Sequence, residues 1–235
     1  MTMLVELAKS AAIGGLIFLD SSSVAQIMIS QPIVCAPLIG WYLGNWQIGL
    51  LIGALLELLW IGKLPIGSHI PPEAPISAMT ATIIYIFLTR GMQVPIGTFV
   101  LAISICCGIL NGFIGGELTI KIRKFNNRFN VMADRYTATG SYLGIEFICL
   151  LAIGLVWLTA ALLIYLGTWI PILILSHWSP VLLQINILKY TLILLVAVGI
   201  AVILDLFRIH NRKRAFIIGL AAGFILAGVI TYLMR

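Results

Sequence analysis

Runs of apolar residues alternate with short polar stretches along the whole chain. The runs occupy residues 4–19, 33–44, 47–62, 76–89, 94–118, 143–166, 181–207 and 215–234. A helix that spans a bilayer needs about 20 mostly apolar residues, and several of these runs reach or approach that length. The pattern therefore predicts an all-α integral membrane protein, a polytopic helical bundle formed by a single domain over residues 1–235.

The first half of the chain, residues 1–118, is interrupted repeatedly. Its apolar runs at 33–44, 47–62 and 76–89 are short and rich in Gly and Pro, and the polar sequence between them is brief. Backbone groups freed by such interruptions cannot face lipid, so these segments must be buried in protein or line a wet cavity. We therefore predict broken or re-entrant helices around a solute site here, and plain spanning helices over 138–235.

Two clusters of basic residues orient the predicted bundle. Residues 119–137 carry five Lys or Arg and residues 208–214 carry four. The positive-inside rule places both clusters in the cytoplasm, so 119–137 is predicted to be a cytoplasmic loop. Two crossings would join the clusters through an uncharged outer connection at 167–180. Glu6 and Lys9 interrupt the first apolar run, which favours a retained membrane helix over a signal peptide.

The composition excludes a soluble enzyme. Hydrophobic residues make up 61% of the chain and charged residues 9%, against roughly 25% charged residues in soluble domains. The net charge of +6 comes from clusters between apolar runs, so no nucleic-acid partner is expected. The four cysteines and three histidines lack metal-ligand spacing, and the sequence contains no phosphate-binding loop. We expect no metal or cofactor, and any phosphoryl chemistry would need another chain.

Glu57 is a carboxylate within the apolar sequence GLLIGALLELLWIG. Placing such a group in the membrane costs a few kcal/mol, and ionisable residues at such positions therefore mark functional sites by default. A structural hydrogen-bond anchor between helices is the alternative.

The segment KLPIGSHIPPEAP, residues 63–75, contains His69 and Glu73 among several Pro and Gly residues that rule out a continuous helix. It can form an ordinary outer loop. It can also fold into the membrane and present hydrogen-bonding groups to a solute.

A third polar stretch, LDSSSVAQIMISQP at 19–32, contains Asp20 and Gln26. Carboxylates and carboxamides suit the neighbouring hydroxyls of a sugar, because each can bridge donors and acceptors. Alternatively, Asp20 and the serines cap the following helix.

Over about fifty residues, the Gly, Pro and polar positions of this chain match a family pattern. The stretch resembles the membrane subunit IIC of the mannose/sorbose family of the bacterial phosphoenolpyruvate-dependent sugar phosphotransferase system. The matching positions are Asp20, Gln26, Gln31-Pro32, Pro37-Leu38, Gly40, Leu43-Gly44, Gly49, Gly53-Ala54, Glu57, Gly62, Ile66-Gly67 and Pro71-Pro72-Glu73-Ala74. Asn45 stands where the family usually has Asp.

The resemblance implies a sugar-translocating subunit in a bacterial inner membrane. Such a subunit is part of an oligomer and works with a IID membrane subunit and cytoplasmic IIA and IIB proteins, and IIB phosphorylates the sugar as it moves inward. The implied sugar contacts are Asp20, Gln26, Glu57, Glu73 and His69. A stand-alone ion-coupled or facilitative transporter and a non-transporting membrane receptor remain the alternatives.

Overall fold

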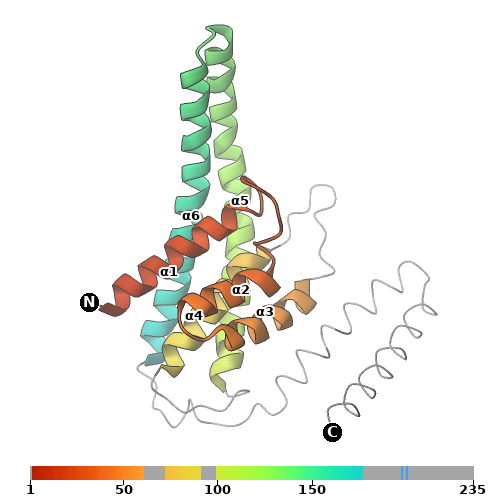
Figure 1. The fold of residues 1–235 in the computed structure, drawn as a ribbon, viewed down its shortest axis with the longest axis vertical. Coiled ribbons are helices and arrows are strands. Elements are labelled where there is room, and N and C mark those ends of the chain that lie inside the picture. Colours follow the sequence, from red (N-terminus) through yellow and green to blue (C-terminus); the bar gives the residue numbers. More distant parts are fainter. Residues whose placement is uncertain (1, 61–71, 91–98, 177–196, 198–199, 201–235) are drawn as a thin grey trace, which may run out of the picture.

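The computed structural model describes residues 2–60, 72–90 and 99–176 and the two positions 197 and 200. The chain over these ranges folds into helices joined by turns and loops (Figure 1). The helices are α1 (Thr2–Leu19), α2 (Pro32–Tyr42), α3 (Trp46–Trp60), α4 (Ala74–Thr89), α5 (Phe99–Ala138) and α6 (Tyr142–Ser176). The predicted all-α fold is confirmed. The predicted helix at 215–234 lies outside the described residues, and so does the predicted helix at 181–207 except for positions 197 and 200.

Short helices α2 and α3 form a hairpin. They contain 11 and 15 residues, fewer than the about 20 that cross a bilayer, as expected for the interrupted first half. Gly44 permits the tight turn between them because its φ of +87° lies in the left-handed region that favours glycine. Asn45 then accepts the backbone N–H of Ile48 at 3.2 Å through Oδ1, so its carboxamide caps the start of α3.

Glycine brings α2 and α3 into close contact. A Cβ on Gly49 would overlap the carbonyl oxygen of Ala36, and one on Gly53 would overlap the carbonyl oxygen of Pro32. The two glycines are four residues apart and therefore share one face of α3. Small residues at this spacing allow helix backbones to approach closely. Gly49 and Gly53 therefore determine how closely α2 and α3 approach each other, and both helices contribute residues to the candidate site described below.

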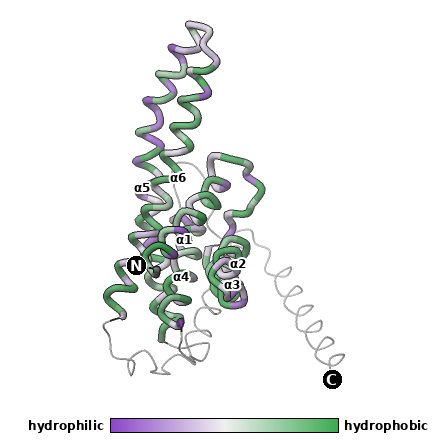
Figure 2. Tube along the Cα trace, turned by 60° about the vertical axis from the view of Figure 1, so that its left-hand side comes forward, coloured by the Kyte–Doolittle hydropathy of each residue, from purple (hydrophilic) through white to green (hydrophobic). Residues whose placement is uncertain are grey.

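The long helices α5 and α6 run side by side as an antiparallel pair (Figure 1). Both are long and apolar enough, by length and composition, to cross a membrane. At about 1.5 Å per residue, the 40 residues of α5 extend for about 60 Å, roughly twice the hydrocarbon thickness of a bilayer. Figure 2 shows hydrophilic residues concentrated on the half of α5 that projects, together with α6, beyond the other helices.

Two connections predicted from the sequence are helical instead. Residues 119–137 continue α5 without a break, because they contain polar helix formers but neither Gly nor Pro. The predicted outer connection at 167–180 is part of α6 as far as Ser176, and Pro171 is accommodated inside that helix. The polar composition of 119–137 and the Gly and Pro of 167–180 therefore do not end the two helices where the sequence predicted. The cytoplasmic location of 119–137 remains a prediction.

Helix α4 is the central helix of the described part. Most of its residues are buried against α2, α3, α5 and α6. The Asn111 side chain, on α5, donates to the Thr80 hydroxyl at 2.8 Å and to the Leu163 carbonyl at 3.2 Å, so it links three helices. At the far end of α4, Arg90 forms a bidentate ion pair with Glu6 at 2.6 and 2.7 Å. These contacts fix the middle and the C-terminal end of α4 against α5, α6 and α1.

Candidate functional site

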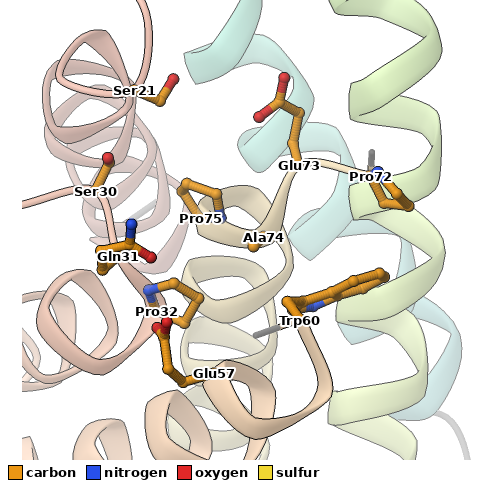
Figure 3. Close-up of a pocket in the computed structure, with 10 residues that line it drawn as sticks. All are labelled: Ser21, Ser30, Gln31, Pro32, Glu57, Trp60, Pro72, Glu73, Ala74 and Pro75. Atoms are coloured by element: carbon orange, nitrogen blue, oxygen red, sulfur yellow. The ribbon is translucent and has the colours of Figure 1, made fainter. Parts of the chain in front are cut away.

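A polar cavity of about 210 Å³ lies between the loop that follows α1, the helices α2 and α3, and the start of α4. We call it the carboxylate cavity. Its lining residues are Ser21, Ser30, Gln31, Pro32, Glu57, Trp60, Pro72, Glu73, Ala74 and Pro75 (Figure 3). Two carboxyl groups face this space from different elements, and none of the described lining residues is basic. The cavity therefore offers hydrogen-bond acceptors in an otherwise apolar protein.

Glu57 reaches the cavity from the last turn and a half of α3. Its Oε2 accepts the backbone N–H of Ile33 at 3.3 Å, in the first turn of α2. Helix N-terminal N–H groups have no partner within their own helix, and Gln31 at the N-cap supplies no side-chain bond. A carboxylate is also favoured at the positive end of a helix dipole. Glu57 therefore combines an anchoring contact with a position in the cavity wall.

Glu73 is fixed by its backbone and by α5. Its N–H donates to the Gly112 carbonyl at 2.9 Å, and its own carbonyl accepts the N–H of Ser77 at 3.1 Å in the first turn of α4. Burial raises the pKa of the Glu73 carboxyl, while a hydrogen bond from Thr119 and the charge of Arg123 act in the opposite direction. The side chain thus stands between the carboxylate cavity and the polar half of α5.

Asp20 does not line the cavity, although the sequence marked it as a sugar contact. Its Oδ1 accepts the N–H of Ile27 at 2.7 Å and its Oδ2 accepts the N–H of Ser30 at 3.0 Å. These donors favour the charged form, so the bonds from Ser30 and Ile27 hold the pKa of Asp20 below its usual range. The side chain is 8% exposed. Asp20 therefore holds the loop that places Ser30 in the cavity wall.

Gln26 is exposed and lies outside the cavity lining. It belongs to a strained part of the same loop, where Ala25, Gln26 and Met28 have φ values of 63°, 53° and 68°. Such left-handed conformations are costly for residues other than Gly, and the Asp20 bonds support them. His69, the remaining predicted contact, lies outside the described residues.

Of the ten lining residues, only Glu57 and Glu73 were predicted from the sequence as site residues, and Ser30, Gln31 and Trp60 are among the other eight. Ser30 and Gln31 come from the polar stretch that also contains Asp20, and Trp60 comes from the end of α3. Trp60 packs edge-on against Phe113 of α5, with ring centroids 5.9 Å apart. The sequence feature that points to these residues is their position within or next to a polar stretch. Periodicity does not show which of the polar residues face the cavity.

Comparisons with known proteins agree with this architecture. A family model described as the PTS system sorbose-specific IIC component matches residues 4–234. The chain is similar to the fructose permease IIC component of Bacillus subtilis (strain 168), with 28% identity over 199 residues that cover 80% of this chain and 68% of the relative. It is also similar to the mannose-specific EIIC component of Escherichia coli (strain K12), with 28% identity over 123 residues, 52% of this chain and 43% of the relative.

A solved structure has the same fold. It is the cryo-electron microscopy structure of the mannose transporter ManYZ in complex with microcin E492, with a TM-score of 0.59 and 21% identity over 100% of this chain and 93% of the matched chain. The family match extends over almost the entire sequence and confirms the membership that the Gly, Pro and carboxylate positions indicated. The chain belongs to the sorbose-specific IIC family of the phosphotransferase system, and it is a IIC permease component of the mannose type.

Proposed function

We propose that this chain translocates a sugar across a bacterial inner membrane, as a multi-pass subunit, for phosphorylation by a partner IIB protein. The sugar would occupy the carboxylate cavity, where Glu57 and Glu73 accept hydrogen bonds from its hydroxyl groups. Ser30 and Gln31 supply further polar contacts, and Asp20 acts by holding their loop.

The observation that carries this proposal is the meeting of Glu57 and Glu73 in one cavity. Glu57 lies in α3 and Glu73 lies 16 residues later, near the end of the Pro-rich segment. Both line the same space of about 210 Å³. Carboxylates suit vicinal hydroxyls because each oxygen accepts more than one hydrogen bond. A ligand site needs a few such polar groups with apolar walls, and Trp60, Pro32 and Pro75 provide those walls.

The proposed partners of this chain are the other components of a mannose-type phosphotransferase system. The chain would assemble with a IID membrane subunit and receive phosphoryl groups through cytoplasmic IIA and IIB proteins. The relatives are named for fructose and mannose and the family for sorbose, so these three sugars are the first candidates.

Uptake by membrane vesicles tests the proposal. Vesicles containing this chain and its IID subunit are supplied with IIA, IIB and phosphoenolpyruvate, and radiolabelled fructose, mannose or sorbose is added. We expect one sugar to accumulate as its phosphate ester, and only when IIB and phosphoenolpyruvate are present. Accumulation of unmodified sugar driven by an ion gradient would favour the stand-alone transporter. Specific sugar binding without any uptake would favour the receptor.

A further inference from the structure

A second cavity, of about 240 Å³, lies between the end of α1 with the loop that follows it, α5 and α6, and its lining is mainly apolar. Its polar lining consists of Ser22, Ser23, Thr119, Arg123 and Asn126. Its described lining contains no carboxylate, and its charged group is the Arg123 guanidinium. We call it the arginine cavity. Its charge is therefore opposite to that of the carboxylate cavity.

One face of α5 connects the two cavities. Gly115 lies against the Glu73 side chain, so that a Cβ added there would be 3.2 Å from the Cβ of Glu73. Thr119 and Arg123 follow at intervals of four residues, which places all three on the same face of the helix. Thr119 and the positive charge of Arg123 both favour the charged form of the Glu73 carboxyl. A solute that passes Glu73 on this face therefore meets Thr119 and then Arg123.

Asn126 adds an unsatisfied acceptor to the arginine cavity. Its Oδ1 is buried and has no hydrogen-bond partner among the described residues. A buried acceptor without a partner is unfavourable, and a hydroxyl group of a ligand would satisfy it. The guanidinium of Arg123, one turn away, presents N–H donors in the geometry that phosphate groups accept. The cavity thus offers one partner for a sugar hydroxyl and one for a phosphoryl group.

We propose that the arginine cavity is an exit site that binds the phosphate monoester of the transported sugar. This inference rests on the proposed function. A neutral sugar can occupy the carboxylate cavity, whereas the anionic ester is repelled by Glu57 and Glu73 and attracted by Arg123. Because the two cavities carry opposite charges, the phosphorylated product would not return from the arginine cavity to the carboxylate cavity. The predicted cytoplasmic location of 119–137 puts the arginine cavity on the side where the ester is released.

Binding measurements on the purified complex of this chain with its IID subunit test the inference. The probes are the sugar that the wild-type complex binds and the phosphate monoester of that sugar. We expect Arg123→Gln to lower affinity for the ester about tenfold or more, since a hydrogen bond to a charged group is lost, and to leave affinity for the free sugar unchanged. Lys124→Gln is the matched control. It makes the same charge change at the next residue, which does not line the cavity, and both affinities should be retained.

Asn126→Leu and its neighbour Asn127→Leu form a second pair, of which only Asn126 lines the cavity. We expect only Asn126→Leu to weaken ester binding. Failure of the wild-type complex to bind any sugar would overturn the proposed function. Sugar binding without ester binding, or equal ester affinities in Arg123→Gln and Lys124→Gln, would overturn only the exit site. If Arg123→Gln loses both affinities, Arg123→Lys must restore the free-sugar affinity and part of the ester affinity for the inference to stand.

Discussion

The Glu57 carboxylate on α3 accepts the backbone N–H of Ile33 at the start of α2, with the two atoms 3.3 Å apart. The same carboxylate lines the cavity proposed to hold the sugar. From sequence, a functional carboxylate and a structural anchor were alternatives for this position. The geometry allows both roles, because Oε2 caps the helix while Oε1 accepts no hydrogen bond from residues 2–60, 72–90 and 99–176. Substitutions that separate charge from hydrogen bonding can therefore distinguish them.

We expect Glu57→Gln to abolish sugar uptake while leaving membrane insertion intact. The carboxamide oxygen still accepts the Ile33 N–H, but the charge-assisted bonds to the sugar are lost, which weakens sugar affinity by about tenfold or more. Isothermal titration of the purified complex and vesicle uptake measure the two effects. Glu146→Gln, an exposed carboxylate on α6, is the control and should behave as wild type. Normal uptake by Glu57→Gln would remove Glu57 from the sugar site.

The helices and the pairing of Glu57 with the Pro-rich segment could be predicted from sequence, for physical reasons. Backbone groups must be satisfied in a membrane, so interrupted apolar runs imply helices packed around a polar space. The role of Asp20 could not be predicted, because a loop with three left-handed residues has no periodicity that shows which side chains face inward. The extension of α5 through 119–137 does not follow from polarity, because loops and exposed helices are both polar, whereas the lack of Gly and Pro there permits a helix.

Asp20→Asn should loosen the loop before α2. Asp20 accepts two N–H groups, one on each carboxylate oxygen, whereas a carboxamide has one oxygen and would direct its own N–H₂ at the second donor. Leaving such a donor unpaired costs about 1–3 kcal/mol. We expect faster proteolysis within residues 21–30 and weaker sugar binding. Asp134→Asn, at an exposed position on α5, should change neither, and unchanged proteolysis of Asp20→Asn would contradict the role assigned to it.

The tip of the hairpin between α5 and α6 should face the cytoplasm. Residues 119–137 are basic, and the positive-inside rule places such sequence inside the cell. A single cysteine at Thr139, introduced after alanine replaces the four native cysteines, should react with a membrane-impermeant maleimide in inside-out vesicles only. Labelling in right-side-out vesicles alone would reverse the orientation and would place the arginine cavity on the wrong side for product release.

Gly53→Ala should destabilise the protein and weaken sugar binding together. A Cβ at Gly53 would overlap the Pro32 carbonyl oxygen and lie 3.1 Å from the Ala36 Cβ, so α2 and α3 must separate. Overpacking of this kind costs about 1–3 kcal/mol. Gly53 is one turn before Glu57, so the separation also moves Ile33 away from its carboxylate partner.

Gly154→Ala provides the matched comparison, because a Cβ there meets nothing within 4 Å. In a helix Ala is favoured over Gly by about 1 kcal/mol, so this variant should unfold in detergent at the same temperature as wild type or slightly higher. Equal melting temperatures for Gly53→Ala and Gly154→Ala would show that α2 and α3 can shift apart without cost. In that case the spacing between these helices would not determine the geometry of the carboxylate cavity, and Glu57 could not depend on α2 for its position.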